Sequence, residues 1–277
     1  MSFFVVKQVN LQTQIKLWGS RLLQFSVILL GASLNFHHVL QQGASGAVIT
    51  FVSISLVFLL GFLGQKLLQL EKNQSLLITM GTAICGGSAI AALAPVIAAD
   101  SVAITISIGI VFLLNALAVF IFPLLGEMMS LSQQDFGLWA ALAIHDTSSV
   151  VAASSIYGEQ ALAVATTVKL TRALWIIPIT LLFSFYPSSK IKRSLTIPWF
   201  IFGFVAMSLI FTFIDSADSW KNSFQTVSKL GFSLTLFCIG LSFDFQKMKK
   251  VGINPLFFGI GLWIIVSVFS LAYIKMF

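Results

Sequence analysis

The sequence predicts an all-α, polytopic membrane helix bundle with inverted-topology repeats and discontinuous helices at the bilayer midplane. Of the 277 residues, 58% are apolar and only 9% are charged, whereas about 25% of residues are charged in an average soluble domain. Long uncharged runs alternate with short charged clusters, and one run is interrupted at its centre by glycine and polar residues. The composition therefore excludes a soluble globular protein.

Uncharged apolar runs define about nine candidate spans in a single transmembrane domain, residues 1–277, because about 20 helical residues cross the hydrocarbon. The spans cover residues 17–36, 46–64, 74–98, 102–126, 136–157, 160–186, 196–214, 224–243 and 253–274. No cleavable signal peptide is apparent, so we expect the first span to act as its own targeting signal.

Most basic residues cluster in the loops between spans, and these loops lie on one side of the membrane if every span crosses it. These clusters account for the formal charge of +7. The positive-inside rule then places the N-terminus in the cytoplasm. The charge indicates topology and not a nucleic-acid partner. The connection over 127–135 carries Glu127 and Asp135 yet falls on the basic side, but acidic residues contribute little to orientation. The basic residues that fall on this side are Lys7, Lys16, Arg21, Lys66, Lys72, Lys190, Lys192, Arg193, Lys247, Lys249 and Lys250.

The third span, 74–98, contains the Gly86-Gly87 pair followed by Ser88. Each glycine costs about 1 kcal/mol relative to alanine in an uninterrupted helix. Such an interruption is tolerated at bilayer depth where it is buried in protein or lines a wet cavity, and discontinuous spans form the binding sites of many secondary transporters. The alternative is that the small residues let another helix pack closely.

Two internal resemblances suggest duplication. Residues 29–36, at the end of the first span, share Gly, Ser and Phe in register with residues 238–245, at the end of the eighth. These spans run in opposite directions in the nine-span topology, as an inverted duplication requires. Residues 84–88 also resemble residues 144–148, but that topology gives their spans the same direction, so we favour the first pair.

Four ionisable residues lie deep inside predicted spans, away from the span ends: His145, Asp146, Lys169 and Arg172. Each costs about 2.5–3.5 kcal/mol at a helix centre on insertion scales, so each is a functional candidate. Lys169 and Arg172 share a helix face because they are three residues apart. Asp146 could pair with one cation and only fix helix packing, but one carboxylate cannot neutralise two cations.

The remaining positive charge favours an anion. Arg172 offers a planar fork and Lys169 a point charge, which together would clamp a small anion. Gly86, Gly87, Ser88 and Ser148 would donate further hydrogen bonds in substrate binding, since a broken-helix N-terminus presents N–H groups. His145 and Asp146 would carry the coupling charge, because histidine titrates near neutral pH.

We expect neither an enzyme nor a metal or cofactor site. The two cysteines, Cys85 and Cys238, lie in apolar segments, and the three histidines are scattered. Adjacent His145 and Asp146 point about 100° apart on a helix, so they cannot orient one another as a catalytic triad requires.

Several motifs, in order, resemble the YeiH-like family of candidate sulfate exporters over about residues 17–266. The resemblance implies a multi-spanning protein of the bacterial inner membrane with inverted repeats. Family members have about two further spans before the first one here, and Asp146 stands where they carry Glu. The motifs are 81–92, 144–153, Lys169-Leu170-Thr171-Arg172 before Pro178, Ile197-Pro198-Trp199-Phe200 and Gly240-Leu241-Ser242.

We therefore expect a secondary transporter that moves a small anion by alternating access, linked to protons. The site charge fits a monoanion, or a dianion with a proton; sulfate follows only from the resemblance. Two alternatives stay open: an anion channel, and an inactive or structural fragment that lacks the first two spans. The expected partners are the anion, the proton and the lipid bilayer, and a homo-oligomer is also open.

Overall fold

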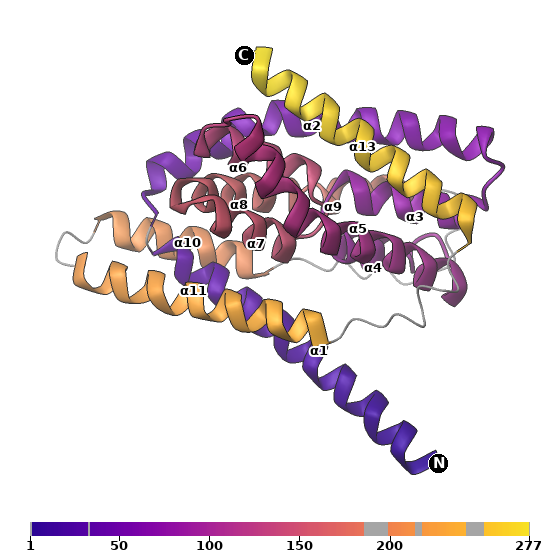
Figure 1. Ribbon diagram of the computed structural model, residues 1–277, viewed down its shortest axis with the longest axis horizontal. Helices are drawn as coiled ribbons and strands as arrows, with labels where there is room; N and C mark the ends of the chain where they lie inside the picture. The colour runs from indigo at the N-terminus through magenta and orange to yellow at the C-terminus, as the bar shows by residue number, and fades with distance from the viewer. Residues whose placement is uncertain (1, 33, 186–198, 214–217, 242–251, 277) are drawn as a thin grey trace. The chain divides into compact units, whose positions relative to one another are not determined.

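The structure is a computed structural model that describes residues 2–32, 34–185, 199–213, 218–241 and 252–276 (Figure 1). It is 87% helical, and these described ranges contain no strand. The chain divides into two compact units, Met1–Gln41 with Pro198–Phe245, and Gln42–Ile197 with Gln246–Phe277. The all-α prediction is confirmed.

The first unit contains α1 (Ser2–Gly31), α10 (Trp199–Phe213) and α11 (Asp218–Leu241). A Cβ on Gly19 would meet Cys238, whereas Ser228 Oγ donates to the carbonyl of Ser26 at 2.7 Å. Helices α1 and α11 are therefore antiparallel, as the inverted duplication of residues 29–36 requires. Residues 242–245 of its second copy lie outside the described residues, and the duplication itself stays a prediction.

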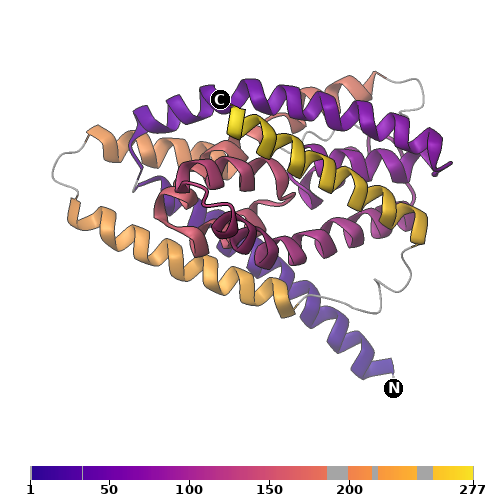
Figure 2. The ribbon, with the colours of Figure 1, turned by 45° about the horizontal axis from the view of Figure 1, so that its top comes forward.

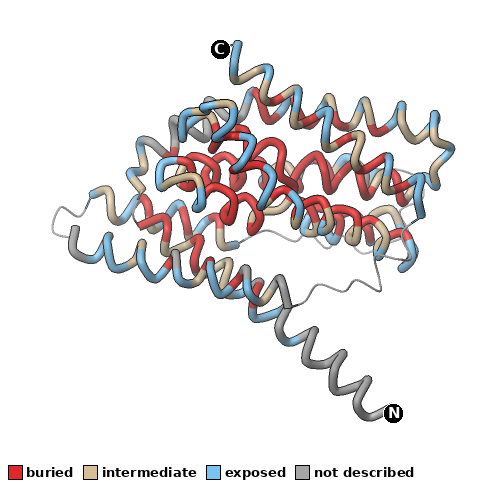
Figure 3. The backbone as a smooth tube through the Cα atoms, viewed as in Figure 1, coloured by how far each residue is buried: buried red, intermediate tan, exposed pale blue. Residues whose placement is uncertain are grey.

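The second unit holds most of α2 (Phe36–Leu67) and the C-terminal α13 (Ile253–Met276). Six helices follow α2 in this unit, and the buried residues of the unit concentrate in them (Figure 3). In Figures 1 and 2, α13 runs across α3, α5 and α6, which it contacts. The six helices are α3 (Lys72–Ala83), α4 (Gly87–Leu93), α5 (Ser101–Met128), α6 (Gln133–Ala143), α7 (Thr147–Tyr157) and α8 (Glu159–Ala173), and α9 (Ile176–Ser184) follows them.

Helices α3 and α4 form a hairpin, which we call hairpin 1 (residues 72–97). A Cβ on Gly81 would lie 3.0 Å from Ile90, nine residues later, so the two helices pack against each other. Helix α3 runs parallel to α5, because Ser107 Oγ donates to the carbonyl of Gln74 at 3.2 Å and Gly81 packs against Val111. The chain therefore enters through α3 and returns through α4.

Helices α6 and α7 form a second hairpin, hairpin 2 (residues 133–157). Its two ends meet, since Phe136 and Tyr157 stack with ring centroids 3.8 Å apart. The Tyr157 hydroxyl also donates to the carbonyl of Leu131 at 2.6 Å. Gly126, near the end of α5, packs against both rings, so hairpin 2 opens where α5 ends.

The two hairpins enter the unit from opposite ends. Helix α5 leads from the open end of hairpin 1 to that of hairpin 2. Helices α8 and α9 lead back, because Gly137 packs against Ala161 near the start of α8, whereas Phe183 of α9 lies beside Lys72 and Ile97. A hairpin followed by a through-running helix thus occurs twice, in opposite directions, which is the arrangement of an inverted repeat.

This arrangement corrects one expectation from the sequence. Residues 84–88 and 144–148 were assigned to segments of the same direction, but α3 runs parallel to α5 and α6 runs antiparallel to it. The two stretches form the tips of oppositely directed hairpins. Segments 74–98 and 136–157 fold back, whereas the nine-span topology expects straight crossings.

Four helical stretches of the described residues are long and apolar enough to cross a membrane, and each overlaps a predicted span. They are Val48–Leu67, Ser101–Met128, Glu159–Ser184 and Ile253–Met276. Two shorter apolar helices, Leu17–Gly31 and Trp199–Phe213, also match predicted spans. A polytopic membrane protein with discontinuous helices is therefore confirmed.

Candidate functional site: the tips of two hairpins

The tip of hairpin 1 is built on a glycine in the left-handed region. Gly86 has φ +64° and ψ −127°, a conformation that residues with a Cβ adopt only with strain. Its N–H donates to the carbonyl of Gly81 at 2.9 Å, which closes the turn between the two helices. A Cβ on Gly86 would lie 3.1 Å from the Cβ of Asp146, so the two hairpin tips touch.

The tip of hairpin 2 is capped by a carboxylate. Asp146 is the N-cap of α7, and its Oδ1 accepts the N–H of Ser149 at 2.9 Å. The hydroxyls of Ser148 and Ser149 donate to the same carboxylate. The first of these bonds satisfies one of the free N–H groups at the start of α7, and the two hydroxyl bonds explain why serines follow Asp146 in an otherwise apolar segment.

Asn115 holds the same tip from the middle of α5. It is buried, and its Oδ1 accepts the N–H groups of His145 at 3.0 Å and Asp146 at 3.4 Å. Sequence reasoning missed this residue, although an asparagine within the apolar run 102–126 was a signal. Neither ring nitrogen of the buried His145 has a hydrogen-bond partner within the described part of the chain.

Lys169 caps the entering arm of hairpin 2. Its ammonium is fully buried and donates to the carbonyls of Ile144 at 2.6 Å and Ala141 at 3.2 Å. The last four carbonyls of a helix have no partner within it, and α6 ends at Ala143. The cation thus satisfies backbone oxygen atoms that would otherwise be exposed to an apolar interior.

Arg172 joins the two hairpins. Its side chain is fully buried; Nε donates to the carbonyl of Ala83 at 2.7 Å, and Nη1 donates to that of Leu142 at 2.6 Å. Nη2 makes longer contacts with the carbonyl of Thr82 and the hydroxyl of Ser53. One guanidinium therefore caps the C-terminal ends of α3 and α6 together.

The helix ends explain how two buried cations are accommodated. A helix C-terminus carries about −0.5 of an elementary charge and an N-terminus about +0.5. The ends of α3 and α6 therefore offset about one positive charge beside Lys169 and Arg172. Asp146 offsets a further charge and caps α7. The beginning of α4 has no side-chain cap.

The sequence-predicted site residues are largely brought together. Gly86, His145, Asp146 and Ser148 lie at the tips, and both cations bind the backbone there. Gly87 begins α4, but Ser88 is exposed, and in the described ranges no hydrogen bond links it to a cation. The cations donate to carbonyls where an anion was expected, so the anion clamp stays a prediction.

Comparison with known proteins gives a family for the chain. Residues 1–259 match the family described as conserved hypothetical protein 698. A UPF0324 membrane protein of Porphyromonas gingivalis is 47% identical over 262 residues, covering 94% of this chain and 79% of the relative. A UPF0324 membrane protein of Vibrio vulnificus is 44% identical over 267 residues, covering 95% and 86%. No solved structure matches.

These matches extend over nearly the whole chain, including both hairpins and α8, and the YeiH-like resemblance fits them. The chain is a membrane protein that belongs to the UPF0324 family, conserved hypothetical protein 698.

Proposed function

We propose that the protein is a secondary transporter of a small anion, in which the hairpin tips form the substrate site. The observation that carries this proposal is that two oppositely directed hairpins meet at a cluster of buried charges. Secondary transporters bind substrate where discontinuous helices end near the midplane. Lys169 and Arg172 are balanced in part by Asp146 and by the ends of α3 and α6, whereas the uncapped start of α4 adds a partial positive charge at the tips, which favours an anionic substrate.

In the proposed mechanism the cations act mainly through their charge, since their hydrogen bonds go to the backbone. Gly87 and Ser88 supply donors close to the substrate, and the Ser148 hydroxyl, which donates to Asp146 in this structure, turns to the substrate when it binds. His145 and Asp146 link the site charge to protonation, because both lie at the contact between the hairpins. Alternating access results when the tip of one hairpin, and then the tip of the other, moves away from the bound substrate.

The same proposal includes a topology of seven crossings and two re-entrant hairpins, with the N-terminus in the cytoplasm of a bacterial inner membrane. The crossings are α1, α2, α5, α8 with α9, α10, α11 and α13. The open end of hairpin 1 then lies on the side of the membrane that carries the basic loops, which we call the basic face. Glu127, Asp135 and Glu159 fall together on the opposite face, which removes the disagreement at connection 127–135, while Asp100 moves to the basic face.

The direct test is exchange of labelled anions by the purified full chain in liposomes. Sulfate, sulfite, bicarbonate and short carboxylates would be compared, with and without a pH gradient. We expect one anion to exchange against itself, with Ser88→Ala and Ser148→Ala weakening exchange and Ser155→Ala leaving it unchanged. Ser155 is a matched control, because its hydroxyl donates within α7 to the carbonyl of Ala152.

The result also separates the alternatives. A channel would conduct the anion, and its flux would not rise when substrate is added on the far side of the membrane. His145→Gln should retain exchange and lose accumulation driven by a pH gradient. If no anion exchanges and none raises the Tm, the anion-transport proposal fails; a bound ligand at one hundred times its Kd should stabilise by about 2.7 kcal/mol.

A further inference from the structure

Three buried polar side chains at the hairpin tips have no hydrogen-bond partner for at least one polar atom within the described residues. They are Thr82 in the last turn of α3, Asn115 in the middle of α5 and His145 in the break between α6 and α7. Each side chain is at most 2% exposed. Because roughly 90% or more of buried polar groups in proteins are paired, such a group of unpartnered atoms indicates a ligand.

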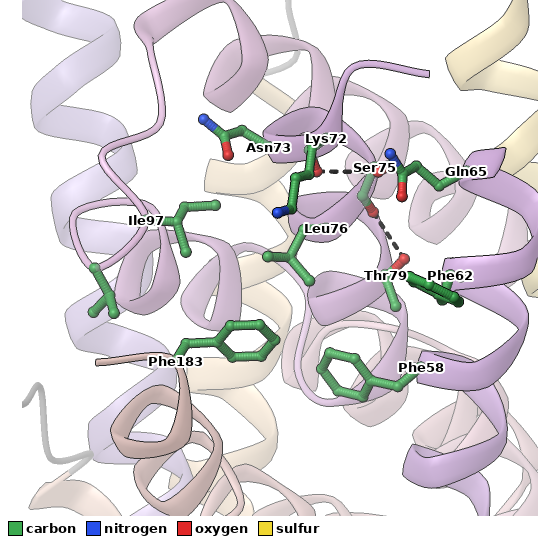
Figure 4. A pocket seen from close by; sticks show the side chains of 12 residues that line it. Phe58, Phe62, Gln65, Lys72, Asn73, Ser75, Leu76, Thr79, Ile97 and Phe183 are labelled. Carbon is green, nitrogen blue, oxygen red and sulfur yellow. Dashed lines mark hydrogen bonds between the residues drawn. The ribbon is translucent and has the colours of Figure 1, made fainter. Parts of the chain in front are cut away.

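The open end of hairpin 1 provides a contrast. A cavity of about 480 Å³ lies there, between α2, hairpin 1 and the end of α9 (Figure 4). The buried hydroxyls in its wall are paired, since Ser75 donates to the carbonyl of Lys72 at 3.1 Å and Thr79 donates to that of Ser75 at 2.8 Å. Among the described residues, no unpartnered buried atom lines this cavity, so the tips are the better candidate for a polar ligand.

The amide of Asn115 has a fixed orientation. Its Oδ1 accepts the backbone N–H groups of His145 and Asp146, at 3.0 and 3.4 Å, so this atom must be the oxygen. The other amide atom, Nδ2, carries two N–H groups, which have no acceptor in the described part of the chain. Asn115 thus holds the tip of hairpin 2 with its oxygen and retains two donors for a ligand.

The tip of hairpin 1 covers this place. A Cβ on Gly86 would lie 3.1 Å from Asp146 and 3.2 Å from Val111, which is one turn before Asn115 on α5. Gly86 therefore packs between α5 and the tip of hairpin 2. The unpartnered groups become accessible when the tip of hairpin 1 moves away, as the proposed alternating access requires.

The unpartnered groups specify the hydrogen bonds that a ligand has to make. Asn115 offers two donors, and the hydroxyl of Thr82 offers a third. A neutral His145 imidazole offers one donor and one acceptor, because only one of its nitrogens carries a proton. The oxygens of an anion accept from the donors, whereas the bare imidazole nitrogen requires an O–H group on the same ligand. A protonated His145 with the corresponding dianion gives a complex of the same composition, since the proton then lies on nitrogen in place of oxygen.

Charged and titratable groups on both hairpins and on α8 surround these side chains. The two cations on α8 compensate the charge of a bound anion, and the one carboxylate is already bonded to two serine hydroxyls. The four groups are Cys85 on hairpin 1, Asp146 on hairpin 2, and Lys169 and Arg172 on α8.

We propose that Asn115, Thr82 and His145 bind the transported substrate directly, and that this substrate is an oxyanion with one hydroxyl proton, such as bicarbonate or hydrogen sulfite. The inference rests on the proposed function and names its substrate class. The proton belongs to the complex whether the anion or the imidazole holds it. A dianion such as sulfate therefore binds together with one proton.

Bicarbonate and nitrate provide the sharpest comparison, because both are planar monoanions of similar size and only bicarbonate carries a hydroxyl proton. Each is titrated by calorimetry, in a closed cell, into the purified full chain in a nonionic detergent. Bicarbonate should bind about tenfold more tightly, since nitrate leaves one buried imidazole nitrogen without a partner. In weakly buffered solution, sulfate should take up one proton for each anion bound, and bicarbonate should take up none.

Thr82→Val tests the site itself. It removes a hydroxyl that has no partner in the described ranges, so the unliganded protein should keep its Tm. Bicarbonate binding should weaken about fivefold, the usual net contribution of one hydrogen bond, and Thr82→Ser should restore it. Ser154→Ala is the matched control, because its hydroxyl is also buried and unpartnered there but lies near the far end of α7.

Substitutions of His145 test the need for an acceptor. His145→Leu should bind bicarbonate and nitrate equally. His145→Gln, whose amide has one donor and one acceptor side, should retain the preference for bicarbonate and lose the proton uptake with sulfate.

Equal affinity of the unmodified protein for bicarbonate and nitrate, or unchanged bicarbonate affinity in Thr82→Val, would overturn the inference. If nitrate or chloride binds and exchanges as well as bicarbonate, transport of a small anion stands and only this substrate class fails. If no anion binds or exchanges, the proposed function fails and this inference fails with it.

Discussion

Hairpin 1 and hairpin 2 both bury two helix ends, but different residues satisfy the backbone groups at those ends. Each brings a helix C-terminus and a helix N-terminus into the interior of the second unit. Both C-termini are capped by Arg172, and that of hairpin 2 is also capped by Lys169. The N-termini differ, because Asp146 caps α7 with its carboxylate, whereas the N-cap of α4 is Gly86, which has no side chain to cap it.

The difference indicates which tip is better fastened. The tip of hairpin 2 is held by Lys169, by Asp146 and by Asn115. The tip of hairpin 1 depends on Arg172 and on the backbone geometry of Gly86. We infer that the returning arm of hairpin 1 is the less constrained of the two. The predictions below would break or sharpen this comparison.

The largest expected effect is an all-or-none labelling pattern. If hairpin 1 folds back in the membrane, Gln69→Cys and Ser101→Cys, which flank it, should react with a membrane-impermeant maleimide from the same face. If hairpin 2 also folds back, Ser130→Cys and Gln160→Cys should both react from the opposite face. All four positions are exposed. Labelling is read on intact and permeabilised cells by a mass shift.

The background for this experiment carries alanine at both native cysteines, Cys85 and Cys238. Nine straight crossings predict the reverse pattern, with the two flanks of each hairpin on opposite faces. Labelling of that kind at either hairpin would contradict its re-entrant path and remove the basis of the comparison.

Removing the guanidinium shared by the hairpins should cause the largest loss of stability. Arg172→Ala deletes two short charge-assisted hydrogen bonds, each contributing about 1.5–3 kcal/mol, so we expect a loss of about 3–6 kcal/mol. Lys169→Ala affects hairpin 2 alone and should lose about half as much. The free energy of unfolding in mixed micelles measures both. Arg21→Ala is the control, because Arg21 is exposed on α1; an equal loss there would show that Arg172 has no special role.

Gly86→Ala should destabilise the tip of hairpin 1 by about 1–2 kcal/mol, the cost of a left-handed conformation for a residue with a Cβ. The added methyl would also press on Asp146. Gly261→Ala is a matched control in α13, where a Cβ would meet nothing within 4 Å. That control should be neutral or slightly stabilising. If the two variants melt at the same temperature, the strained turn at Gly86 is not a constraint on the tip.

The smallest effect is expected at the open end of hairpin 2. Tyr157→Phe removes the hydroxyl that donates to the Leu131 carbonyl and retains the ring stacked on Phe136. The loss should be about 1 kcal/mol, the usual net contribution of one hydrogen bond. Hydrogen exchange should become faster at the ends of α6 and α7 but not in hairpin 1. Faster exchange in both hairpins would argue that their open ends are coupled.

The sequence predicted the helical class, the membrane location and the break at Gly86-Gly87, because each depends on local composition. It placed His145 and Asp146 on a continuous helix, but they lie in the break between α6 and α7. It also predicted that the four ionisable residues lie in one region. It did not predict that the broken segments return. An apolar run of about 25 residues has the same hydropathy whether it crosses or folds back, and the packing of Gly81 on Ile90 that decides between them is not visible in a hydropathy pattern.

The partners of the cations were missed for a related reason. Lys169 and Arg172 donate to backbone carbonyls, which every residue carries, so no residue type identifies the acceptor. Counting formal charges also left out the partial charges at the ends of α3 and α6. Asp146 was predicted as the carboxylate of the site, but its position as the N-cap of α7 required the break to be located to the residue.

The order of the chain has a consequence for biosynthesis. The carbonyls that receive Arg172 and Lys169, at residues 82–83 and 141–144, precede both cations in the sequence. Because the ribosome makes the chain from its N-terminus, both hairpins are available in the membrane before α8 leaves the translocon. The most polar of the four candidate spans, Glu159–Ser184, with a mean hydropathy of 1.4 against 2.6 for α5, therefore enters the bilayer with its acceptors already in place.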